Sequence, residues 1–96
     1  MDDPLVAEYR ARISAADDDL LAALNHRLRL VSELHAHKRR RGYPLFDGGR
    51  EQEVVERAIA RNPGPLSDKG VSEVYALLLP LCTAEARRLA EKAAPA

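Results

Sequence analysis

Two cations interrupt a stripe of apolar residues in the first half of the sequence. Arg27 and Lys38 are eleven residues apart, which is about 20° of rotation around a helix, so both share one helix face with Val31 and Leu34. A charge on an apolar face is costly unless it finds a counter-charge or reaches solvent. The neighbouring carboxylates are Glu33, Asp47 and Glu51. The pattern therefore predicts either internal ion pairs and solvated cations or a pocket for an anionic ligand.

A third cation, Arg10, lies seventeen residues before Arg27. On a helix this is about 25 Å along the axis and roughly 100° around it. One chain therefore cannot easily bring Arg10 to the small ligand that Arg27 and Lys38 would share, whereas a partner chain could.

Charged residues also begin a second predicted helix, where Asp47, Arg50 and Glu51 cluster. Acids at the cap and in the first turn stabilise a helix, so capping explains them as well as ligand binding does. The basic run at residues 37–41 ends the first predicted helix. The run complements the helix dipole there. We prefer this explanation to contacts between the run and nucleic-acid phosphates.

Other catalytic groups are sparse. The sequence has one cysteine, Cys82, and three histidines, too few and too scattered for a disulfide or a tetrahedral zinc site. His26 and His35 have no nucleophile at useful spacing and are predicted to be helix-surface or packing residues. Gly48-Gly49 follows no strand, so a nucleotide phosphate loop is not expected. We expect neither a metal nor a cofactor.

The composition is that of a globular protein, with 46% apolar and 31% charged residues. Fifteen basic and fifteen acidic residues balance, so a nucleic-acid partner is not indicated. No apolar run approaches the ~18 residues of a membrane span. The acids Asp2, Asp3 and Glu8 stand where a secretory signal would be apolar. We expect a cytoplasmic protein.

These residues require helices to position them. Turn-forming clusters at residues 42–44, 48–49 and 62–65 separate three segments of helical periodicity, with no strand-like alternation. Helices are expected at about 5–41, 48–61 and 68–92, begun by Pro4, Asp47 and Ser67 and, for the first, ended by Gly42. Pro80 should bend the third. We predict one all-α domain over residues 1–96.

The first helix is too long for its own domain. It would span about 55 Å, whereas a compact chain of this length is roughly 32 Å across. Its apolar stripe continues over the whole length, so the overshooting half needs cover from another molecule. A closed two-fold dimer is the commonest arrangement that provides it. We predict an intertwined helical homodimer.

The order and spacing of these residues over 5–82 resemble the all-helical chorismate mutases. The matching residues are Tyr9-Arg10, Ile13-Ser14, Ala16, Asp17, Leu20-Leu21, Arg27, Lys38, Asp47, Arg50-Glu51 and Val55-Glu56-Arg57. That family forms intertwined dimers of three-helix subunits, which agrees with the length argument.

The resemblance implies the Claisen rearrangement of chorismate to prephenate in aromatic amino acid biosynthesis. This unimolecular step needs no nucleophile, metal or cofactor. The substrate is a small dicarboxylate whose ether oxygen gains negative charge at the transition state. By position, Arg27 and the partner subunit's Arg10 would clamp the carboxylates, and Lys38 would donate to the ether oxygen.

The same resemblance gives roles to the start of the second helix. Arg50 would support the carboxylate network around the substrate. Glu51, with the backbone near Asp47, would hold the ring hydroxyl.

The third helix departs from the family. Members usually carry a glutamine there as a second donor to the ether oxygen, one turn after a small hydroxyl residue. Alignment places Cys82 at the hydroxyl position and Ala86 at the glutamine. Glu85 or Arg87 would substitute if Pro80 shifted the register, and Glu85 would donate only when protonated. Some small members are activated by docking to the first enzyme of the shikimate pathway, and this chain resembles them.

Three alternatives share some of these features. Isochorismate-pyruvate lyases have the three cations but usually lack the D-x-x-R-E start that Asp47, Arg50 and Glu51 form. A 4-amino-4-deoxychorismate mutase would differ only at the ring substituent, and Glu51 suits an ammonium as well as a hydroxyl. A non-catalytic helical dimerisation or regulatory module would explain the long stripe, but not the two cations within it.

Overall fold

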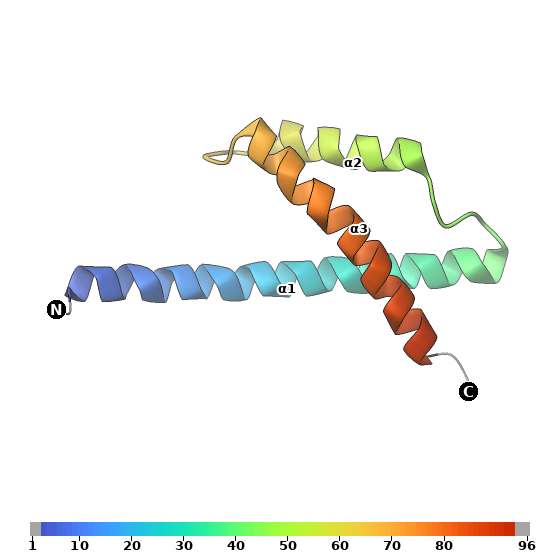
Figure 1. Cartoon of the computed structure of the whole chain (residues 1–96), viewed down its shortest axis with the longest axis horizontal. Helices are drawn as coiled ribbons and strands as arrows, with labels where there is room; N and C mark the ends of the chain where they lie inside the picture. Colours follow the sequence, from blue (N-terminus) through green and yellow to red (C-terminus); the bar gives the residue numbers. More distant parts are fainter. Residues whose placement is uncertain (1–2, 94–96) are drawn as a thin grey trace.

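The computed structural model describes residues 3–93, which form three α-helices joined by two short loops (Figure 1). α1 spans Pro4–Arg41, α2 spans Gly48–Arg61 and α3 spans Asp68–Ala93. No strand occurs in this part of the chain. The predicted all-α fold is confirmed, and each helix begins and ends within one residue of its expected position.

Local capping chemistry defines the helix ends. Side-chain oxygens of Asp3, Asp47 and Ser67 accept backbone N–H groups two or three residues later, at 2.8, 3.2 and 3.0 Å. These bonds satisfy amides that have no partner within the first helical turn. Gly42 ends α1 in the left-handed conformation, with φ of 72°, which costs glycine little. α3 continues through Pro80, so the proline does not divide it.

α3 joins the other two helices. It crosses the C-terminal half of α1 and packs against α2, whereas the N-terminal half of α1 projects away from both (Figure 1). The buried apolar residues of the described chain all lie on α3, namely Val71, Cys82 and Ala86. The radius of gyration is 17.5 Å, against about 12.5 Å for a compact chain of this length. The single chain is therefore an extended, thinly packed unit.

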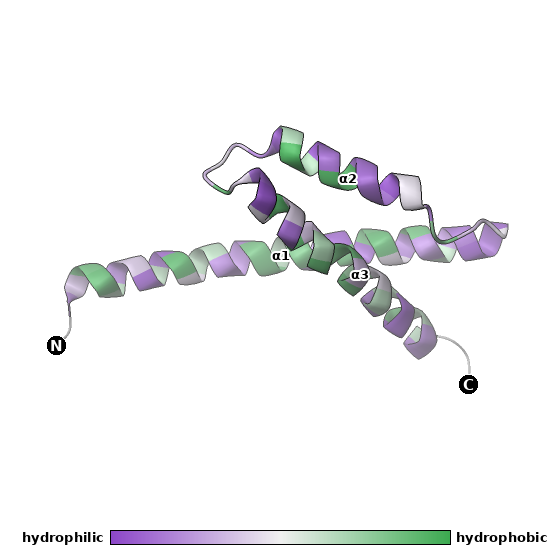
Figure 2. Ribbon diagram, turned by 45° about the horizontal axis from the view of Figure 1, so that its top comes forward, coloured by the Kyte–Doolittle hydropathy of each residue, from purple (hydrophilic) through white to green (hydrophobic). Residues whose placement is uncertain are grey.

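Apolar residues continue along the projecting half of α1 (Figure 2). Ile13 is 60% exposed and Leu20 is 56% exposed in the single chain. Among the described residues, no helix is both long and apolar enough to cross a membrane.

Candidate active site

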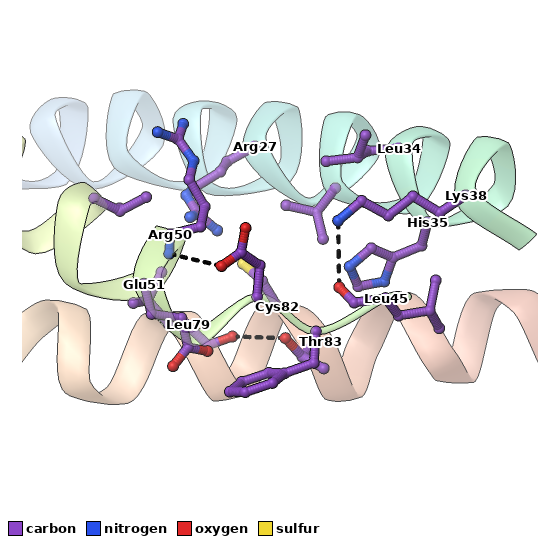
Figure 3. Close-up of a pocket in the computed structure, with 14 residues that line it drawn as sticks. Arg27, Leu34, His35, Lys38, Leu45, Arg50, Glu51, Leu79, Cys82 and Thr83 are labelled. Carbon is purple, nitrogen blue, oxygen red and sulfur yellow. Dashed lines mark hydrogen bonds between the residues drawn. The ribbon is translucent and has the colours of Figure 1, made fainter. Parts of the chain in front are cut away.

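A pocket of about 260 Å³ opens between the C-terminal half of α1, the loop before α2, the start of α2 and the middle of α3 (Figure 3). Six of the residues predicted from the sequence line it: Arg27, Lys38, Asp47, Arg50, Glu51 and Cys82. Arg10 and Glu85 do not line it. The three helices therefore gather most of the predicted site within one chain.

The α1 wall carries both predicted cations. Arg27 and Lys38 are half-buried, with Val31 and Leu34 between them on the same wall. Neither cation forms an ion pair with a carboxylate of residues 3–93. Lys38 instead donates from Nζ to the backbone oxygen of Leu45 at 3.3 Å. The internal ion pairs considered from the sequence are absent from this part of the chain, which leaves the charges available to an anionic ligand.

The start of α2 faces this wall. Asp47 caps the helix through Oδ1, and Glu51 lies one turn further on. The guanidinium of Arg50 is 3.5 Å from a carboxylate oxygen of Glu53, in an exposed pair that contributes little to stability. Capping thus explains the position of Asp47, while Arg50 and Glu51 keep side chains at the pocket.

The α3 wall contributes Cys82 and Thr83. Cys82 is buried, whereas Thr83 is exposed and donates its hydroxyl proton to the backbone oxygen of Leu79 at 3.2 Å. Thr83 was not predicted as a site residue from the sequence. The only signal was that Thr83 follows Cys82 in the sequence. That signal was weak, because adjacent residues are 100° apart around a helix and rarely share a face.

Glu85 lies away from the pocket and is held by a neighbour. Its carboxylate accepts a hydrogen bond from Nε of Arg88 at 2.7 Å. Ala86 is buried at 1% exposure and also does not line the pocket. This placement disfavours Glu85 as a donor to substrate, because α3 keeps its helical register through Pro80.

His35 also lines the pocket, although it was predicted from the sequence to be a helix-surface or packing residue. Its spacing held a signal, since it is three residues before Lys38 and such residues are neighbours on a helix. Partial burial lowers the pKa of His35 below its ordinary value, and the charges of Arg39 and then Lys38 lower it further.

Arg10 lies on the projecting half of α1 and is exposed. It is separated from Arg27 by about 25 Å of helix. The pocket of one chain therefore lacks the third predicted cation.

The fold and the pocket define a helical protein with a cationic wall facing a carboxylate-bearing helix start. Comparisons with known proteins identify the family to which this fold belongs. A family model described as chorismate mutase type II matches residues 9–87. The chain therefore belongs to the type II chorismate mutase family, an enzyme family of the isomerase class, as the sequence predicted. Among curated proteins, no sequence gives a significant match.

Two solved structures of chorismate mutase from Thermus thermophilus are similar to this chain. Form II is 25% identical with a TM-score of 0.81, and the match covers 86% of this chain and 94% of that one. Form I is 26% identical with a TM-score of 0.76, and the match covers 80% of this chain and 96% of that one.

Proposed function

We propose that the pocket binds chorismate and rearranges it to prephenate. The observation that supports this most directly is the pair of cations, Arg27 and Lys38, that share one half-buried wall without a carboxylate partner in residues 3–93. A dicarboxylate would neutralise that wall, and family membership names a dicarboxylate substrate.

The reaction needs little from the protein beyond charge and confinement. As the ether C–O bond breaks and a C–C bond forms within the same molecule, the ether oxygen becomes more negative. Lys38 would donate to that oxygen, Arg27 would bind a carboxylate, and Arg50 would support them. Glu51 and the backbone near Asp47 would hold the ring hydroxyl. Holding the side chain over the ring converts binding energy into a reactive geometry.

The first prediction is that the purified chain consumes chorismate. Loss of the absorbance of chorismate should follow enzyme concentration, and prephenate should be the product. Parallel reactions with isochorismate and 4-amino-4-deoxychorismate test the two alternative activities. The amino analogue is included because Glu51 suits either a ring hydroxyl or a ring ammonium. Pyruvate release from isochorismate, or faster turnover of the amino analogue, would replace the proposed substrate. No turnover of any of the three would favour a non-catalytic module.

We also propose that the active form is a homodimer in which the partner subunit's Arg10 completes the site. The single chain exposes 7957 Å², whereas a compact monomer of this mass exposes about 5,500 Å². The excess of roughly 2,500 Å² is within the range that a stable interface buries. Large apolar side chains of α1, among them Ile13, Leu20 and Leu34, are exposed in the single chain, so a second copy is the natural cover.

The second prediction follows from that surface. At micromolar concentration the chain should sediment with twice its monomer mass of 10.6 kDa, and the helical circular dichroism should be lost together with the dimer on dilution or in denaturant. A monomer that keeps its full helix content would contradict the proposal, because Leu20 and Leu34 would then remain in water without cover.

An activating complex with the first enzyme of the shikimate pathway is the remaining part of the proposal. Phe46 lines the pocket yet is 72% exposed, so the pocket mouth is open in the single chain. A docked protein that closed this mouth would exclude water and strengthen the electrostatic contacts inside. Adding that enzyme to the chorismate assay tests for a higher rate.

A further inference from the structure

A neutral hydrogen-bonding group lies beside Lys38 in the pocket. His35 precedes Lys38 by three residues, so the two side chains are neighbours on α1. Figure 3 shows the imidazole ring next to the hydrogen bond from Lys38 to the Leu45 oxygen. Within residues 3–93, the His35 ring forms no hydrogen bond and its nitrogens remain accessible. The ring is thus positioned toward the ligand space with its donor unused.

The other two histidines are differently placed. His26 and His37 are exposed and do not line the pocket. His37 packs edge-on against Tyr43, with ring centroids 6.2 Å apart. His35 is therefore the pocket histidine of the described chain, and the other two serve as controls.

The surroundings of His35 favour its neutral form. Burial lowers its pKa below the ordinary value, and Arg39 and Lys38 lower it further. A neutral imidazole has one nitrogen that donates and one that accepts. The charged or titratable groups that line the pocket with it are Arg27 and Lys38 from α1, Asp47, Arg50 and Glu51 from the start of α2, and Cys82 from α3.

The α3 wall offers no comparable donor. The hydroxyl proton of Thr83 is already given to the Leu79 oxygen at 3.2 Å. The buried thiol of Cys82 is a weak donor. On the facing α1 wall, the imidazole of His35 is a neutral donor adjacent to Lys38.

We propose that His35 donates a hydrogen bond to the ether oxygen of the bound substrate, alongside Lys38. The inference rests on the proposed rearrangement, since that reaction places developing negative charge on this oxygen. A neutral donor adds stabilisation there without adding another cation to a wall that already carries Arg27 and Lys38. The bond strengthens as the C–O bond breaks, so its effect falls on kcat more than on substrate binding.

The third prediction tests this role by substitution. His35→Ala should lower kcat by about 10- to 100-fold, with KM changed much less. His35→Gln keeps an N–H donor of similar reach and should recover most of the loss. His26→Ala, the same change on the same helix outside the pocket, should leave kcat unchanged. Circular dichroism and sedimentation of each variant verify the fold and assembly.

A second measurement does not depend on turnover. Histidine pKa values are followed by NMR, with and without an oxabicyclic dicarboxylate that mimics the transition state. In the free protein the pKa of His35 should lie below its ordinary value. The bound dianion favours the imidazolium, so it should raise the pKa of His35.

The outcomes separate the two proposals. Full turnover by His35→Ala, or an equal loss in His35→Gln, would overturn the role of His35 while leaving the mutase activity intact. A His35 pKa that does not change when the mimic binds would also overturn it. If the unaltered chain does not rearrange chorismate, the proposed function fails first, and the inference about the ether oxygen fails with it.

Discussion

Replacing Lys38 with alanine should lower kcat by about 10² to 10³, the usual effect of losing one donor to developing negative charge. The ground-state ether oxygen carries little charge, so KM should change much less than kcat. Lys38 already donates to the Leu45 oxygen at 3.3 Å, and an ammonium has three donors. That contact orients Nζ while leaving protons for the substrate. Steady-state kinetics with chorismate measures both parameters.

A matched control for Lys38→Ala is available on α3. Lys69 is 86% exposed at its side chain, forms only a 3.9 Å pair with Glu73 and does not line the pocket. Lys69→Ala should therefore leave kcat and KM unchanged. A large rise in KM for Lys38→Ala at constant kcat would mean that Lys38 holds a carboxylate, and the donor role would have to be reassigned.

The sequence alone was sufficient to predict the three helices and the two cations of the α1 pocket wall. Helix caps act within three residues, so Asp47, Ser67 and Gly42 determined helix ends that agree with the structure. The shared face of Arg27 and Lys38 depends only on helical periodicity. For the same reason, local patterns predicted that Asp47, Arg50 and Glu51 stand together.

The part of the site that could not be predicted depends on how helices cross. Periodicity describes a face of α3, but it does not say which residues of that face meet α1. Thr83 lines the pocket and Glu85 does not, because α3 crosses α1 at one particular angle and register. The helical spacing placed His35 beside Lys38, but its position in the pocket also depends on the loop residue Leu45 beside it (Figure 3), whose path no helical pattern predicts.

The position of Arg10 leads to the second large effect. Arg10 lies about 25 Å along α1 from Arg27, on the half that neither α2 nor α3 covers. If α1 of each subunit reaches into the other, the partner subunit's Arg10 and the chain's own Arg27 would meet at one substrate. Arg10→Ala and Arg27→Ala homodimers should each lose most activity, because removing one partner of a desolvated charge pair is costly.

Mixing the two inactive variants then gives a quantitative expectation. In a heterodimer, one site lacks both arginines and the other has both. If random exchange makes half of the dimers mixed, about a quarter of the wild-type activity should return. The recovery should appear at the rate of subunit exchange, which sedimentation or mass spectrometry of differently labelled chains follows independently. An Arg10 that served its own chain's pocket would give no intact site in any dimer.

The control mixture uses two residues that already share one chain's pocket. Arg27 and Lys38 line the same wall of a single chain, so an Arg27→Ala and Lys38→Ala heterodimer has one defect in each site. This mixture should remain inactive although its subunits exchange as freely. Recovery there as well would show that activity returns for a reason other than Arg10. Recovery only in the mixture that contains Arg10→Ala would mean that the active site exists only between two chains, which explains why the projecting half of α1 keeps its apolar stripe.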